Sequence, residues 1–192
     1  MEYKVVRYIL LGQLSLFGFL LVCLLLIPHF LLAPNEGGVS NYGLYAKTVV
    51  PYSLAFGLCG LLTLVSARFL PKELPAYAAV KRALISLGFL LIAVLLSTYP
   101  YKVNNTFNEI HIYAGSALAF LEMGLGLWFA AVLVRNIKNI LLLVIQLTGF
   151  GLGILTHFGL IHILFVSELV TSLAFGALLI RTIITLSNEI IV

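Results

Sequence analysis

Two glutamates lie inside apolar stretches that are long enough to cross a membrane. Glu122 follows His111 by eleven residues, which is roughly 16 Å along a helix at about 1.5 Å per residue. Glu168 lies in another stretch, on the same side of a helix as Thr171 and Ser172. An ionised carboxylate at the centre of a bilayer costs at least about 2.5–3.5 kcal/mol, so such residues usually face protein or a wet cavity. Both glutamates are therefore the leading candidates for binding a ligand or handling a proton.

Neither glutamate has a basic partner nearby in its own stretch. Arg181 lies thirteen residues beyond Glu168, near the far end of the same helix. Each carboxyl group must therefore be protonated, face a wet cavity or accept hydrogen bonds from neighbours. The candidate neighbours are Gln146, Ser116, Thr171 and Tyr113. Two interpretations stay open, a neutral glutamate that links helices by hydrogen bonds and a carboxyl group that handles protons or a ligand.

All four histidines are expected at one end of the molecule, because each lies where an apolar stretch begins or ends. They are His29, His111, His157 and His162. Imidazole binds zinc, copper and haem iron, and it titrates near neutral pH. No His-x-x-x-His pair or HExxH helix joins any two of them. Histidine is also an ordinary residue at a membrane interface, so a metal site and an interfacial role both stay open.

Two polar loops are expected at the same end as the histidines. The first, residues 33–43, is rich in glycine and includes Ser40 and Asn41, a composition typical of turns. The second, residues 101–110, is rich in asparagine. In it, Asn108 is expected to cap the fourth helix, with Glu109 in the first turn near the positive end of the helix dipole. Together the two loops predict a polar lid over the bundle.

The composition requires a membrane to surround these residues. Hydrophobic residues make up 62% of the chain and charged residues 9%, with a mean hydropathy of +1.15. A soluble domain has about 25% charged and about 45–50% apolar residues, so this chain cannot cover a water-facing surface. The net charge of +4 is explained by attraction to anionic lipids and does not indicate a nucleic-acid partner.

Six apolar runs have the length of a membrane span. A bilayer core about 30 Å thick needs roughly 20 apolar residues in a helix. The runs lie near residues 8–30, 48–69, 82–101, 111–134, 139–157 and 162–186. The last two are joined by a short turn in which Gly159 permits a tight reversal. We predict an all-α, integral membrane six-helix bundle with up-down topology, forming a single transmembrane domain over residues 1–192.

The basic residues predict the orientation of this bundle. Nine of them fall at one end of the predicted helices, namely Lys4, Arg7, Arg68, Lys72, Lys81, Arg82, Arg135, Lys138 and Arg181. Only Lys47 and Lys102 fall at the other end. Because cytoplasmic loops retain Lys and Arg, both termini are expected in the cytoplasm, and the protein in a plasma or cytoplasmic membrane.

Helical spacing groups small and polar residues on three faces. On the fourth predicted helix the stripe comprises His111, Gly115, Ala119, Glu122 and Gly126, and on the fifth it comprises Gln146, Gly149, Gly153 and His157. Glu168, Thr171 and Ser172 form the third group. Such stripes face protein in membrane bundles, where small residues let helices pack closely. Cys23 and Cys59 form no Cys-x-x-Cys pair, which argues against thiol–disulfide chemistry.

A further pattern carries a resemblance to a family. Pro28-His29 is followed by Gly38-Val39-Ser40-Asn41-Tyr42-Gly43, then by Pro100 at the end of the third span and His111 at the start of the fourth. The chain resembles the six-span membrane proteins of the damage-regulated autophagy modulator type and related prokaryotic six-span families. Those share a hydrophobic-Ser-x-x-Gly element and a histidine opening the fourth helix. Asn41 stands where the related element often has Asp. The resemblance implies a membrane protein and no defined molecular activity.

Three functions remain open. The first, which we favour because no complete catalytic set is present, is a non-enzymatic membrane protein that interacts with lipids or serves as an accessory subunit of a partner membrane protein. The second is a small proton-coupled transporter that uses Glu122 and Glu168, which predicts a water-accessible cavity between helices four, five and six. The third is a metal-dependent intramembrane hydrolase using the histidines. It is disfavoured because ceramidase-like enzymes have seven spans and use His and Asp ligands with a Ser, whereas this chain has six predicted spans and no Asp. No motif indicates a particular cofactor.

Overall fold

The computed structural model describes residues 2–28, 38–98 and 105–188. Six long helices make up the bundle and no strand occurs in these ranges. The helices are α1 (Glu2–Leu26), α2 (Val49–Ser66), α3 (Tyr77–Thr98), α4 (Asn105–Trp128), α5 (Ile137–His157) and α6 (Leu164–Asn188). Two short elements complete the chain: η2 (Val39–Leu44), a 3₁₀ helix, and η3 (Phe129–Leu133), a π-helical turn that continues α4.

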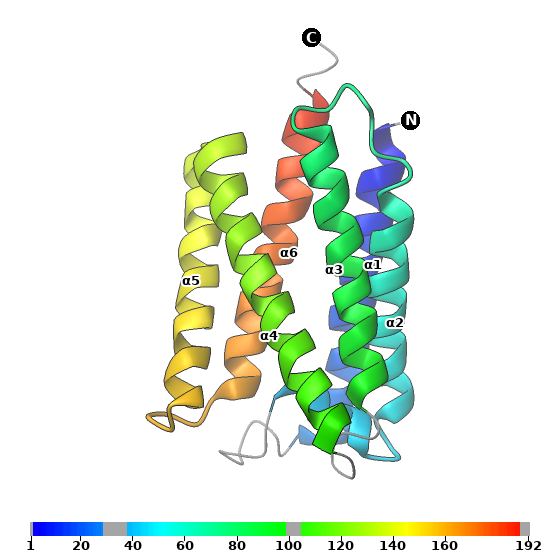
Figure 1. Ribbon diagram of the computed structural model, residues 1–192, viewed down its shortest axis with the longest axis vertical. Helices are drawn as coiled ribbons and strands as arrows, with labels where there is room; N and C mark the ends of the chain where they lie inside the picture. The colour runs from blue at the N-terminus through cyan, green and yellow to red at the C-terminus, as the bar shows by residue number, and fades with distance from the viewer. Residues whose placement is uncertain (1, 29–37, 99–104, 189–192) are drawn as a thin grey trace.

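Each of the six helices is long and apolar enough to span a membrane, which confirms the predicted six-helix membrane bundle. Successive helices run in opposite directions, and the first residues of α1 lie at the same end of the bundle as the last residues of α6 (Figure 1). We call this the terminal end, and we call the opposite end, which holds η2 and the turn between α5 and α6, the η2 end. The helix α4 begins at Asn105, so Asn108 lies inside the helix and its predicted role as the cap was wrong.

The helices pack most closely in the pairs α1 with α2 and α5 with α6. Small residues make close packing possible within a membrane, where lipid supplies no hydrophobic driving force between helices. Between α2 and α3, a Cβ atom on Gly88 would lie 2.9 Å from the backbone oxygen of Gly60. Because that distance is too short for a real contact, only glycine at position 88 permits this helix spacing.

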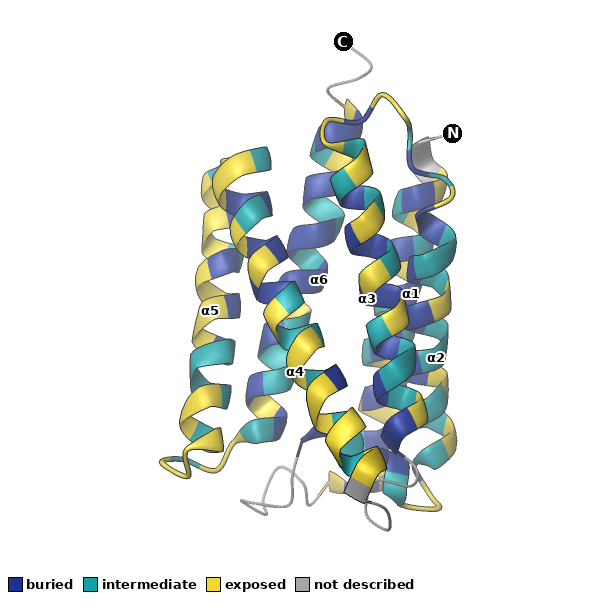
Figure 2. Cartoon of the chain, viewed as in Figure 1, coloured by how far each residue is buried: buried dark blue, intermediate teal, exposed yellow. Residues whose placement is uncertain are grey.

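The helix α4 packs mainly on α3, and it makes fewer contacts with α5 and α6. It crosses the bundle obliquely and approaches α5 at the terminal end and α3 at the η2 end (Figure 1). Figure 2 shows exposed residues along much of α4 and α5, whereas α6 lies at the centre and is the most buried span. The oblique path of α4 leaves α5 and α6 less covered at the η2 end.

The terminal end of the bundle is filled by a hydrophobic cluster from α1, α3, α4, η3, α5, α6 and the segment that joins α2 to α3. Phe129 of η3 and Phe175 of α6 stack there with ring centroids 6.5 Å apart, and both are almost fully buried. Leu125, Leu178 and Leu179 are also buried in this cluster. The terminal half of the bundle is therefore closely packed.

The turn between α5 and α6 reverses at Gly159, as the sequence predicts. Gly159 has φ +71°, a left-handed conformation that glycine adopts at little cost. The backbone N–H of Gly159 donates to Thr156 O at 2.9 Å, and that of Leu160 donates to Leu155 O at 3.0 Å. These bonds satisfy the last carbonyls of α5 and bring α6 back along it.

Candidate functional site

A cavity of about 580 Å³ lies between α4, α5 and α6 and reaches α1, α3 and η2. This volume is within the range of about 300–1,000 Å³ that is typical of small-molecule sites. Exposed residues of two helices form part of its lining, among them Ser116 and Phe120 of α4 and Ile154 of α5. The rings of Phe120 and Phe150 meet edge-on between α4 and α5, with centroids 5.6 Å apart. The exposed lining residues indicate that the cavity opens between these two helices on the η2 side of this contact, toward the surrounding lipid.

Five of the residues singled out in the sequence line this cavity. They are Glu122, Glu168, His111, His157 and Ser40. Gly115, Ala119, Gly149 and Gly153 of the predicted stripes also line it, whereas Gly126 and Gln146 do not. A cavity therefore lies between helices four, five and six; its access to water stays a prediction.

The other candidates lie elsewhere. Gln146 and Asn41 are buried next to the cavity without lining it, and Glu109 and His162 are exposed outside it. His29, residues 33–37 of the first predicted polar loop and residues 101–104 of the second lie outside the described residues. The predicted lid is represented only by η2, which contributes Val39 and Ser40 to the cavity wall.

Glu168 links α6 to η2. The backbone N–H of Val39 donates to Glu168 Oε2 at 2.7 Å, a short distance typical of a hydrogen bond to a charged acceptor. A side chain at position 38 would overlap both carboxylate oxygens, so Gly38 permits this approach. The half-buried Glu168 therefore holds η2 at the mouth of the bundle and is itself fixed in orientation.

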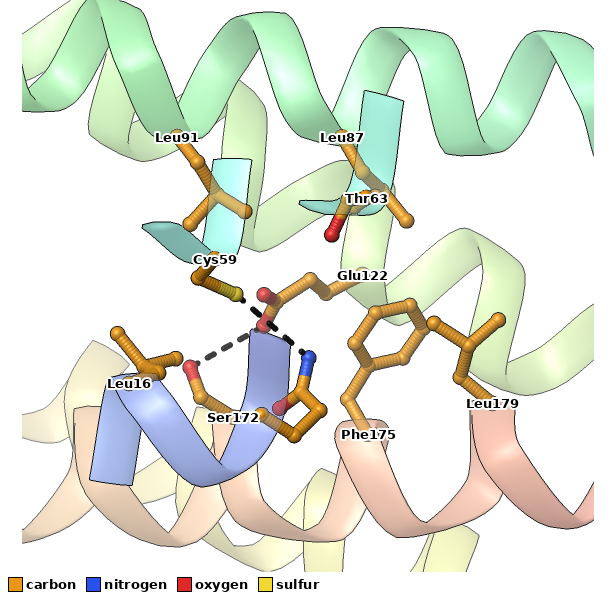
Figure 3. A pocket seen from close by; sticks show the side chains of 10 residues that line it. Leu16, Cys59, Thr63, Leu87, Leu91, Glu122, Ser172, Phe175 and Leu179 are labelled. Atoms are coloured by element: carbon orange, nitrogen blue, oxygen red, sulfur yellow. Dashed lines mark hydrogen bonds between the residues drawn. The ribbon is translucent and has the colours of Figure 1, made fainter. Parts of the chain in front are cut away.

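Glu122 lies deeper, at the base of the cavity, and is only 7% exposed. Ser172 Oγ donates to Glu122 Oε2 at 3.3 Å (Figure 3). Ser172 follows Glu168 by four residues, about 6 Å along the helix, so one face of α6 serves both glutamates. The predicted partners were wrong: Gln146 donates to the backbone oxygen of Glu122, at 2.9 Å, and not to its carboxyl group.

A smaller pocket of about 10 Å³ adjoins Glu122 on the side of α1 and α2. This is close to the space that one water molecule needs, about 10–15 Å³. Gln13, Cys59 and Thr63 line it together with Glu122 (Figure 3). Gln13 Nε2 lies 3.9 Å from Cys59 Sγ, while Gln13 Oε1 is buried and has no hydrogen-bond partner among the described residues. Gln13 was not among the residues predicted from the sequence, although a polar residue within an apolar span is itself a signal.

His111 is anchored by the end of α3. The Thr98 hydroxyl donates its proton to Val94 O at 2.7 Å, so it can only accept from its other neighbours. These are Tyr52 Oη at 3.0 Å and His111 Nδ1 at 3.4 Å. His111 therefore donates from Nδ1, and this assignment follows from the hydrogen-bond pattern.

Ser97 approaches the same ring but has no features of a nucleophile. Its Oγ lies 3.2 Å from His111 Nδ1 and donates to Ala93 O at 2.7 Å. The hydroxyl proton is thus committed to the backbone, and the imidazole nitrogen that faces it is a donor. General-base activation requires the opposite arrangement, with the nitrogen accepting the hydroxyl proton.

No three metal-ligating side chains come together within the described ranges. Of the three described histidines, two line the cavity, and His162 lies outside it. Because His29 is outside the described residues, the histidine metal site as a whole stays a prediction.

Outside the spans, η2 contains a buried tyrosine. Tyr42 Oη donates to Ile27 O at 3.3 Å, and the ring of Tyr42 meets Phe165 edge-on with centroids 5.9 Å apart. Burial raises the pKa of the Tyr42 phenol to about 12, because a phenolate is disfavoured away from water. Tyr42 therefore remains neutral and fixes η2 against α1 and α6.

Comparison of the chain with protein-family models, curated proteins and solved structures found no match. The function is therefore inferred from the site itself. The cavity is a partly apolar volume with one carboxyl group from α4 and one from α6 in its lining, which suits binding of a ligand that reaches it through the membrane.

Proposed function

We propose that this polytopic membrane protein binds one amphiphilic ligand, a lipid or lipid-like molecule, in the cavity between α4, α5 and α6. The observation that carries the proposal is the lateral opening of the cavity between α4 and α5. A lipid can enter there without leaving the bilayer. A water-soluble ligand has no need of an opening toward lipid.

The lining supports both parts of such a ligand. Aromatic and aliphatic side chains suit an acyl chain, and they include Phe17, Phe56, Phe120, Phe150 and Leu169. The polar groups are concentrated toward the η2 end, where Glu168, Ser40 and His111 suit a headgroup. We place this end at the outer surface, following the distribution of basic residues.

The test is to fill the cavity from a position that accepts a side chain. Gly115 lines the cavity, and a Cβ atom there would meet no atom within 4 Å. Gly124 on the same helix is equally open but exposed and outside the cavity. We expect native mass spectrometry in mild detergent to detect one retained lipid in the parent protein and in Gly124→Phe, and none in Gly115→Phe. Equal lipid retention in all three proteins would refute the proposal.

A second function is supported by the two glutamates. Glu122 of α4 and Glu168 of α6 line one cavity, and Ser172, which donates to Glu122, follows Glu168 by four residues on α6. Two acids in one cavity within the membrane-spanning part are suited to proton-coupled transport. In proteoliposomes containing a pH-sensitive dye, Glu122→Gln should then abolish proton flux while leaving expression intact. Unchanged flux would exclude this mechanism. The accessory role beside a partner membrane protein and the family resemblance stay predictions, and a partner that copurifies in mild detergent would support the former.

A further inference from the structure

The described lining of the cavity contains acidic side chains but no strongly basic ones. It includes two carboxyl groups, two imidazoles and several hydroxyls, but no Lys or Arg. A phosphate or carboxylate headgroup would meet no cation there and would lie beside two acids. Burying an uncompensated anion in that position is unfavourable, so the lining selects against anionic headgroups.

Glu168 has acceptor sites left for a ligand. A carboxylate offers about four lone-pair positions, and Val39 N–H is the one donor within the described residues found to occupy Glu168. Acceptor positions on the carboxyl group therefore remain for a ligand, and Glu168 is part of the cavity lining. The ligand group best matched to it carries several N–H donors and a positive charge.

We propose that the polar end of the bound amphiphile is a primary ammonium group, held by the Glu168 carboxylate. This inference rests on the proposed binding function and names the ligand class for the same site. A primary ammonium donates three hydrogen bonds. One is directed to Glu168, and the hydroxyls of Ser40 and Ser167 lie in the same part of the lining. The apolar chain then passes Phe120 and leaves through the lateral opening.

The test compares three amphiphiles that differ only in the headgroup. Dodecylamine, dodecanol and dodecanoate are titrated into the full chain in mild detergent, and binding is followed by native mass spectrometry. We expect dodecylamine to bind at least tenfold more tightly than the other two. Glu168→Gln, which keeps an acceptor for Val39 N–H, should remove this preference. Glu109→Gln is the control for surface charge, because Glu109 is exposed outside the cavity, and it should retain the preference.

A second comparison identifies the source of the amine. Retention of phosphatidylethanolamine over phosphatidylcholine would support a bilayer lipid whose headgroup carries the ammonium. Preference for dodecylamine without that lipid selectivity would support a single-chain amine.

The outcomes separate this inference from the proposed function. If dodecanol binds the parent protein as tightly as dodecylamine, the ammonium headgroup is refuted while amphiphile binding stands. If Glu109→Gln removes the preference as fully as Glu168→Gln, the site assignment is refuted. If no amphiphile or lipid binds at all, the proposed function itself fails.

Discussion

The contact between α5 and α6 at Gly149 gives the sharpest test of the cavity wall. A Cβ atom at Gly149 would lie 2.8 Å from the backbone nitrogen of Thr171 and 3.1 Å from the backbone oxygen of Ser167. The Thr171 side chain can rotate, but the backbone of α6 cannot move without separating the helices. To restore an ordinary contact of 3.4 Å at the Thr171 nitrogen, the helices must part by about 0.6 Å, which is the overpacking that core substitutions cause.

The size of the effect follows from this overlap. Overpacking of a close-packed contact costs about 1–3 kcal/mol. Gly151 lies two residues after Gly149 on the same helix, and a Cβ atom added there would meet no atom within 4 Å. Gly151→Ala therefore adds helix propensity without an overlap. For a chain of this length, about 1 kcal/mol changes the unfolding midpoint by roughly 2–4 °C. Gly149→Ala should therefore unfold about 2–12 °C below Gly151→Ala.

The assay uses the single tryptophan of the chain. Trp128 lies at the end of α4 with its ring 5.4 Å from that of Phe129, so unfolding of the terminal end changes its fluorescence. Both variants are heated in the same mild detergent at the same protein concentration. Equal midpoints would refute the reasoning, because they would mean that α5 and α6 do not approach each other closely at position 149.

Two further predictions concern η2. In Gly38→Ala the added Cβ would overlap the Glu168 carboxylate, so the hydrogen bond from Val39 N–H to Glu168 should break. Hydrogen exchange of the Val39 amide should then accelerate at least tenfold, since a hydrogen bond to a charged group contributes about 1.5–3 kcal/mol. An unchanged exchange rate would contradict this contact. Burial raises the pKa of Tyr42 to about 12, above its unfolded value, so the stability that it contributes is intact below about pH 10 and is lost as the pH rises through about 12. In a pH titration followed by tyrosinate absorbance, the parent protein should show one tyrosine that ionises near pH 12, and Tyr42→Phe should lack it. If Tyr42 ionises near pH 10 instead, η2 is not packed as described.

The membrane fold could be predicted from the sequence because it depends on composition and on helical spacing. Six apolar runs gave six spans, and the stripe that contains Gly115 and Glu122 does face the cavity. The error at Asn108 arose because α4 extends into the polar region before the apolar run. Apolarity therefore marks the membrane-spanning part of that helix and not its first residue.

The partners of the two glutamates could not be predicted in the same way. Glu168 accepts from Val39, which is 129 residues away in the chain, and this contact depends on how η2 folds back over the bundle. Glu122 is reached by Ser172 because of the oblique path of α4, which no local pattern determines. Gln13 was detectable from its polarity alone, but its position beside the Glu122 pocket requires the packing of α1 against α2.

The closed terminal half has an electrical consequence. Moving one elementary charge across a whole membrane at 100 mV involves about 2.3 kcal/mol. Where water fills the cavity, the potential changes little, and it falls mainly across the dry layer around Phe129 and Phe175. A cation that reaches Glu168 from the η2 end therefore crosses only a small part of the membrane potential. Its affinity for Glu168 should therefore be nearly independent of the membrane voltage.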